Sequence, residues 1–242
     1  GGEQTRHALG LDSRPIVLLP ANVIGDSLTL GRQVFTQTMT EWLEGTIRYF
    51  SRRPDVQLII RIHPGERYTT GPSVAEVAKR VLGEMADIQP NGHIRLIAAQ
   101  DPINTYDLVE IADLGLAYTT TVGMEMSMSG VPVILGGQTH YRNRGFTLDP
   151  QNWQEYYLMI EKALQNPVES RLSRQQVESA WNYAYRFFFE YPCPFPWHLL
   201  DFWETSEAWT IEKVLSPEGQ AQYGDTFRYL TGEPRAWHLE TN

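Results

Sequence analysis

Short apolar runs alternate with helix-like patterns from Pro15 to about Pro167, and this alternation restricts the possible folds more than any other feature. Between the runs, apolar residues recur at the spacing of an amphipathic helix, for example over residues 35–50 and 73–86. Strands separated by helices predict a parallel sheet with right-handed crossovers and helices on both faces. We therefore predict an α/β, Rossmann-like domain over residues 15–166. Its expected strands are residues 16–19, 57–62, 94–98, 113–117 and 131–135.

The last helix of this domain has a recognisable start. Asp149 is followed by Pro150, the combination of an N-cap residue and a first-turn proline. This pair predicts a helix that opens at Asp149 and continues to about Leu164. Shorter helical patterns cover residues 104–111 and 122–129.

The remaining residues, 167–242, differ in character and are rich in aromatic side chains interrupted by Pro192, Pro194 and Pro196. We expect a helical, aromatic-rich C-terminal extension that packs on the domain or on a missing partner domain. Binding to a membrane surface is the alternative. The acidic residues of this segment argue against it, because interfacial helices usually carry a basic polar face. These residues are Glu190, Asp201, Glu204 and Glu207.

Charge and composition exclude several classes of protein. The formal net charge of −9 argues against a nucleic-acid partner, which requires clustered Lys and Arg. Cys193 is the only cysteine, so no internal disulfide can form, and the run of about 18 apolar residues typical of a transmembrane helix is absent. We expect a cytoplasmic protein, with peripheral attachment to the inner membrane left open. Because the chain begins Gly1-Gly2 without Met, we also expect the natural protein to be longer.

Polar or glycine-rich segments follow all five expected strands. In open α/β sheets, ligands bind in the crevice beyond the carboxyl ends of the strands. Five such segments at one edge indicate a nucleotide site. Besides the segments discussed below, the residues assigned to nucleotide or phosphate binding are Asn22, Gly25, Asp26 and Gln100.

The segment Thr119–Glu125 is the most informative of these. Three hydroxyl groups and Gly123 occur where a strand turns into a helix, and the backbone N–H groups and the helix dipole at such a point suit a phosphate. An ordinary threonine N-cap is the alternative. Glu125 completes no capping box, since Val122 occupies the Ser or Thr position, so its carboxylate could accept hydrogen bonds from ribose hydroxyls. Simple complementarity to the helix dipole is the alternative for Glu125.

His63 follows a buried strand and precedes Pro64, which favours an extended backbone at the histidine. Its imidazole could donate to a phosphate oxygen, or become cationic as a leaving group gains charge. A structural histidine is the alternative. The sequence contains no His or Cys pair at zinc-site spacing, no P-loop, no dinucleotide-binding glycine motif and no nucleophile elbow. We expect neither a metal nor another cofactor.

Several of these segments, in this order, resemble the capsule polysaccharide biosynthesis glycosyltransferases. Those enzymes have a GT-B architecture, and several use CMP-activated sugars such as Kdo. Bacterial sialyltransferases contain a similar His-Pro pair followed by Ser or Thr residues. The resemblance covers about residues 15–150. The segments that carry it are Arg61–Glu66, Asp113, Thr119–Glu125, Gly130–Val133 and Tyr141–Thr147.

The resemblance implies that this chain is the nucleotide-sugar-binding half of a GT-B glycosyltransferase. His63 and Thr119, Thr120 and Thr121 would then hold the donor phosphate, Gly123 would let the backbone approach it, and Glu125 would contact ribose or sugar. His63 and Glu125 would be the catalytic residues. A CMP-sugar is the favoured donor, with a UDP-sugar as the alternative, and the acceptor would be a polysaccharide or glycolipid.

Two departures from the family pattern qualify this interpretation. Met126 stands where the family usually has a small residue after the glutamate, and no second domain for the saccharide acceptor is recognisable. We therefore expect the chain to lack an N-terminal acceptor domain and to be inactive alone. Two other functions remain open: a nucleotide-sugar epimerase of similar fold, and a non-catalytic nucleotide-binding or interaction domain.

Overall fold

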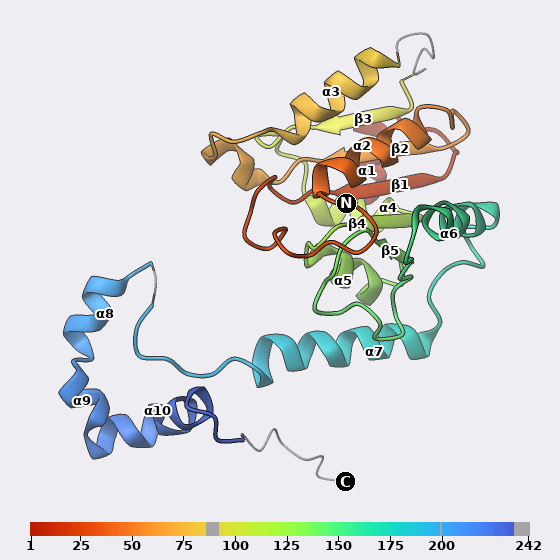
Figure 1. The fold of residues 1–242 in the computed structure, drawn as a ribbon. Coiled ribbons are helices and arrows are strands. Elements are labelled where there is room, and N and C mark those ends of the chain that lie inside the picture. The colour runs from red at the N-terminus through yellow and green to blue at the C-terminus, as the bar shows by residue number, and fades with distance from the viewer. Residues whose placement is uncertain (86–91, 199, 235–242) are drawn as a thin grey trace. The chain divides into compact units, whose positions relative to one another are not determined.

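The computed structural model describes residues 1–85, 92–198 and 200–234, and the chain forms two compact units, Gly1–Asn182 and Tyr183–Asn242. The first unit contains a five-stranded sheet with the strand order β3-β2-β1-β4-β5, in which all neighbours pair in parallel (Figure 1). The expected α/β class is thus confirmed, with small shifts at the strand ends. The strands are β1 Ile16–Pro20, β2 Gln57–Arg61, β3 Ile94–Ile97, β4 Leu114–Ala117 and β5 Val133–Leu135.

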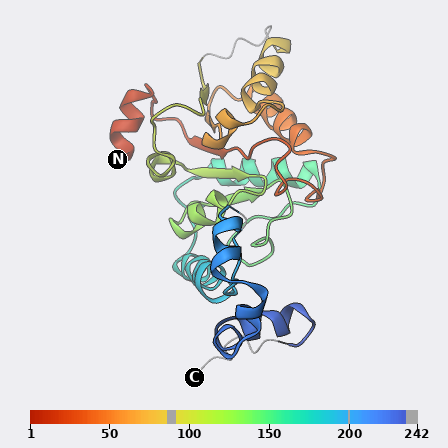
Figure 2. The ribbon, with the colours of Figure 1, turned by 90° about the vertical axis from the view of Figure 1, so that its left-hand side faces the viewer.

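Helices cover both faces of the sheet, as predicted for strands that are buried on both sides. On one face, α2 (Met39–Phe50), α3 (Val74–Glu84) and α6 (Trp153–Gln165) pack on alternate strand residues such as Val17 and Leu19. Figure 2 shows α1 (Gly2–Ala8), in red, on the opposite side of the sheet from α2, in orange. Two further helices belong to the first unit and lie near the site described below, α4 (Thr105–Ile111) and α5 (Val122–Met128).

The N-terminus of α6 corrects one expectation. Asp149 does not cap this helix; Asn152 does, through its side-chain oxygen, which accepts a hydrogen bond from the Glu155 N–H at 2.9 Å. The Asp149 carboxylate instead accepts hydrogen bonds from the Asn143 N–H and the Thr147 hydroxyl. The Asp149 carboxylate therefore closes the preceding loop, and the helix begins later than the sequence indicated.

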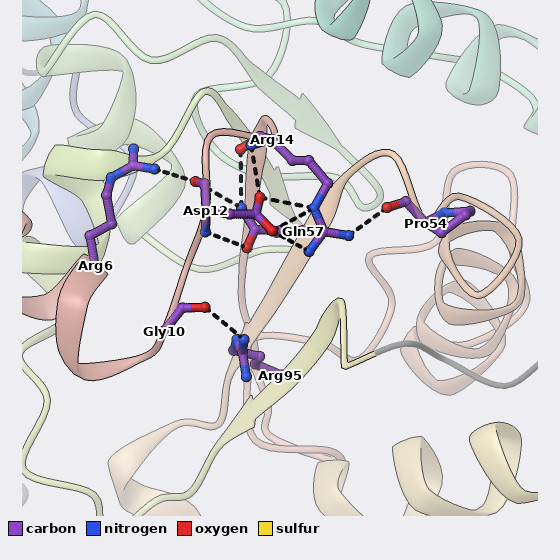
Figure 3. Close-up of polar contacts among 7 residues, drawn as sticks. All are labelled: Arg6, Gly10, Asp12, Arg14, Pro54, Gln57 and Arg95. Carbon is purple, nitrogen blue, oxygen red and sulfur yellow. Dashed lines mark hydrogen bonds and ion pairs between the residues drawn. The ribbon is translucent and has the colours of Figure 1, made fainter.

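The segment before β1 is held to the amino end of the sheet, the end opposite the predicted site. Figure 3 shows Arg14 beside Asp12 and Gln57, with Arg95 reaching the Gly10 carbonyl. The hydrogen bonds from Arg14 lower the pKa of Asp12 to about 2. These contacts fasten the segment before β1 to the start of β2 and to β3.

The second unit begins within α7 (Arg174–Tyr185) and has a small core of its own. The Trp197 indole donates to the Trp209 carbonyl at 2.8 Å, and the Trp209 and Tyr223 rings meet edge to face at 4.9 Å. The predicted helical character of this region is confirmed, while Phe189 and Trp203 remain mostly exposed. None of the described helices is both long and apolar enough to cross a membrane. The elements are η2 Arg186–Glu190, α8 Phe202–Ala208, α9 Ile211–Leu215 and α10 Pro217–Leu230.

Candidate functional site

A pocket of about 190 Å³ lies at the carboxyl edge of the sheet in the first unit. The ends of β1 and β2 form one side, and the first turns of α4 and the β4–α5 loop form the other. This is the position at which ligands of open α/β sheets bind. The side chains on which the site depends are Arg61, His63, Thr105, Tyr106, Thr120 and Val122.

His63 is exposed in this pocket, and its imidazole has a defined hydrogen-bonding state. It precedes the short helix η1 (Pro64–Tyr68), and its Nδ1 atom accepts a hydrogen bond from the Gly65 N–H at 3.0 Å. An Nδ1 atom that accepts carries no proton, so in the neutral ring the proton is on Nε2. His63 is therefore prepared to donate from Nε2 to a ligand.

Thr120 is arranged in a similar way at the end of β4. Its hydroxyl oxygen accepts a hydrogen bond from the Val122 N–H at 3.3 Å, which leaves the hydroxyl proton available for a ligand. The Thr120 hydroxyl can therefore hold the start of the helix and donate to a ligand at the same time. Thr121 precedes α5 without a side-chain capping bond.

Asn22 and Thr119 are both buried. The Asn22 side-chain oxygen accepts a hydrogen bond from the Thr119 N–H at 3.1 Å, which joins the β1–α2 connection to the β4–α5 loop. The Thr119 hydroxyl has no partner among the described residues. In this geometry Asn22 positions the loop that carries Thr120.

Gly123 has a packing requirement that the sequence did not show. A Cβ atom at this position would lie 2.4 Å from the Tyr141 hydroxyl and 2.9 Å from the Ala117 Cβ. The Tyr141 hydroxyl also donates to the Thr120 carbonyl at 2.6 Å. Tyr141 is thus a positioning residue, and only the 21-residue separation in the chain concealed its contact from sequence reasoning.

Glu125 reaches the pocket through Tyr106. The hydrogen bond to the Glu125 carboxylate and the negative charge of that carboxylate raise the pKa of Tyr106, a residue that lines the pocket and is 60% exposed. The second Glu125 oxygen is buried without a hydrogen-bond partner among the described residues. Glu125 itself is not among the pocket-lining residues.

The remaining predicted residues do not line this pocket. Gly25 is exposed with a φ of 83°, and Gln100 is exposed beyond β3. Asp26 accepts hydrogen bonds from the Ser27 hydroxyl and the Leu28 N–H within its own turn.

Arg61 is one of the pocket residues that sequence reasoning did not assign to the site, together with Thr105, Tyr106 and Val122. It is the last residue of β2 and only 5% exposed, and its guanidinium donates to the carbonyls of Ala98, at 2.5 Å, and Asp101, at 3.3 Å. Burial lowers its pKa. A charged residue within the apolar run 57–62 was the signal that could have identified it.

Comparisons with known proteins identify similar structures only. No protein-family model and no curated protein matches the chain. Sucrose-phosphate synthase from Thermosynechococcus elongatus matches with a TM-score of 0.52 and 18% identity, over 74% of this chain and 44% of that one. KpsC, a β-Kdo 2,4 transferase from Thermosulfurimonas dismutans, matches with a TM-score of 0.43 and 18% identity, over 69% of this chain and 44% of that one. UDP-GlcNAc 2-epimerase from Neisseria meningitidis matches with a TM-score of 0.44 and 13% identity, over 74% of this chain and 42% of that one.

The likeness to sucrose-phosphate synthase concerns the fold. It shows that the chain shares a Rossmann-like α/β fold with that protein. The chain spans less than half of the length of each of these three structures.

Proposed function

We propose that this chain is the donor-binding half of a glycosyltransferase and binds the phosphate of a nucleotide-activated sugar. The observation that carries the proposal is the matched state of His63 and Thr120. Each comes from a different strand end, lines the same pocket and accepts a backbone N–H, so that each retains one proton for a ligand. A phosphate needs such donors from more than one loop. The sequence resemblance and the GT-B-like fold support this choice among anionic ligands.

In the proposed reaction, the bond between the sugar anomeric carbon and the donor phosphate breaks, and its electron pair remains on the phosphate oxygen. The acceptor hydroxyl forms the new glycosidic bond, and its proton passes to a base outside this chain. The His63 Nε2–H and the Thr120 O–H would stabilise the charge that develops on the phosphate. Such preorganised donors are usually a large part of enzymatic rate enhancement.

We propose a CMP-sugar as the donor, with a UDP-sugar as the alternative, and a polysaccharide or glycolipid as the acceptor. Tyr106 and Glu125 would contact the ribose or the sugar beyond the phosphate. Thr121, Gly25, Asp26 and Gln100 would contact outer parts of the donor. An N-terminal acceptor domain, supplied by the natural protein or a partner, completes the proposed enzyme.

A ligand panel tests the proposal. Thermal unfolding of the chain would be followed with CMP, UDP and GDP, each beside its nucleoside. A nucleotide at 100 times its Kd should stabilise the fold by about 2.7 kcal/mol, and the nucleoside should do much less at the same concentration. If none of the nucleotides shifts the melting temperature at millimolar concentration, the proposal fails. If a nucleotide does bind, a product assay with the acceptor domain restored separates sugar transfer from epimerisation.

Glu125→Gln tests the arrangement of the ligand. If Glu125 and Tyr106 contact the ribose or sugar, this substitution should weaken binding of a nucleotide more than binding of inorganic phosphate. Calorimetry with both ligands measures the difference. Equal losses for both ligands would contradict a contact between Glu125 and the ribose or sugar.

A further inference from the structure

Arg61 is a buried charge in the wall of the pocket. The residue is 5% exposed, and its guanidinium remains cationic at neutral pH even though burial lowers its pKa. Removing an ion from water costs several kcal/mol unless other groups compensate it. The groups around Arg61 therefore indicate whether its charge is already satisfied.

Those groups are neutral where they touch the guanidinium. Nη1 donates to the Ala98 carbonyl and Nη2 to the Asp101 carbonyl, and Nε has no hydrogen-bond partner among the described residues. The Asp101 carboxylate attracts Arg61 without forming an ion pair with it, and its Oδ1 accepts the Ile103 N–H at 3.0 Å. Within the described residues, the charge of Arg61 thus has no direct counter-ion.

We propose that Arg61 makes this pocket selective for phosphorylated ligands by supplying a fixed positive charge in its wall. The inference rests on the proposed function and assigns the selectivity for the phosphate to one residue. Each Nη atom donates one of its two N–H groups to a backbone carbonyl, and these bonds fix the positive charge of Arg61 at the pocket wall. Buried charges are screened much less by salt and water than exposed ones.

Arg61 also positions the opposite wall. Its two hydrogen bonds join the end of β2 to the β3–α4 connection, which leads directly into Thr105 and Tyr106. If the role of Arg61 is purely structural, replacing it should weaken the binding of every ligand that touches this wall. If its role is electrostatic, replacing it should weaken the binding of the charged ligand selectively. Comparing a nucleotide with its nucleoside therefore separates the two roles.

The experiment measures the ratio of the affinities for CMP and cytidine in the whole chain, by calorimetry or by competition. Arg61→Met should lower this ratio about 10- to 100-fold, because it removes the charge and keeps much of the side-chain length. Arg61→Lys, measured at a pH at which the introduced amine is protonated, should keep the ratio within about threefold of wild type, because it keeps the charge.

Arg142 provides matched controls. It is another buried arginine, 4% exposed, and it donates to the carbonyls of Leu135, Gly137 and Pro150 away from the pocket lining. Arg142→Met and Arg142→Lys should lower the melting temperature and leave the CMP-to-cytidine ratio unchanged.

The outcomes are distinguishable. If wild type binds CMP and folded Arg61→Met keeps the wild-type ratio, the inference is wrong while the proposed function stands. If Arg61→Met does not fold, Arg61→Lys decides: loss of the ratio in a folded protein that retains the charge overturns the inference. If wild type binds neither CMP nor any other nucleotide of the panel, the proposed function and the inference both fail.

Discussion

The Tyr141 hydroxyl donates a 2.6 Å hydrogen bond to the Thr120 carbonyl and so joins the loop after β5 to the loop after β4. Both residues are buried, and the same hydroxyl occupies the space where a side chain at position 123 would lie. One phenol group thus supports the backbone that presents the Thr120 hydroxyl to the pocket. The geometry of the candidate site depends on this contact between Tyr141 and Thr120.

Tyr141→Phe should destabilise the fold by about 0.5–1.5 kcal/mol and should also weaken nucleotide binding. The stability loss is modest because the Thr120 carbonyl keeps its hydrogen bond from the Gly123 N–H. Urea denaturation and calorimetry with CMP measure the two effects. Tyr156→Phe is the matched control, since its buried hydroxyl meets Thr46 at 3.0 Å on the other face of the sheet. It should cost similar stability and leave CMP binding unchanged; equal losses of CMP affinity in both variants would contradict the positioning role.

Alkaline pH should destabilise wild type more steeply than Tyr141→Phe. Burial, followed by the charges of Glu125 and Asp149, raises the pKa of Tyr141 above its ordinary value of about 10. The folded state therefore favours the neutral phenol, while the unfolded chain ionises near pH 10. The stability from this difference is fully present below pH 10 and is lost progressively as the pH rises above it. Urea denaturation at pH 9 and pH 11 should show a larger loss for wild type, and identical losses would refute the prediction.

Gly123→Ala should destabilise the first unit by about 1–3 kcal/mol, because the added methyl group overlaps the Tyr141 hydroxyl and the Ala117 side chain. Gly83→Ala is the control within a helix. A Cβ atom at Gly83 in α3 meets nothing within 4 Å, so that substitution should stabilise by about 0.5–1 kcal/mol. Opposite signs in thermal unfolding are expected. A neutral Gly123→Ala would show that Tyr141 can move without cost.

His63→Ala should weaken nucleotide binding about 10- to 150-fold without unfolding the chain, since a hydrogen bond to a charged group contributes about 1.5–3 kcal/mol. The side chain is exposed and supports little packing. His198→Ala, which changes another exposed histidine that is not among the pocket-lining residues, should have no effect on binding. Calorimetry on both variants checks this, and normal binding by His63→Ala would remove the phosphate assignment.

Local sequence patterns predicted the fold well where apolar spacing decides the structure. The five strands appear close to their expected positions, because a parallel strand buried on both faces needs a continuous apolar run whatever surrounds it. The start of α6 was predicted wrongly, because Asp149 and Asn152 are both suitable caps by residue type. Asn143, with a φ of 60°, and Gly145, with a φ of 86°, form a turn that brings the Asn143 N–H to the Asp149 carboxylate. Asp149 is therefore engaged in this loop and does not cap α6.

For the site, the sequence by itself determined that polar residues such as His63 and Thr120 would meet at one edge of the sheet, because the carboxyl ends of parallel strands lie together. Only the tertiary structure decided which of them share a pocket and what their protons do. The state of His63 depends on a turn to Gly65, Tyr141 meets Thr120 from another loop, and Arg61 lies beside a wall made by residues 98–106. These relationships depend on distances between separate strand ends, which residue spacing does not contain. Periodicity reports the face on which a side chain lies, while hydrogen-bonded contact is set by the packing of the whole unit.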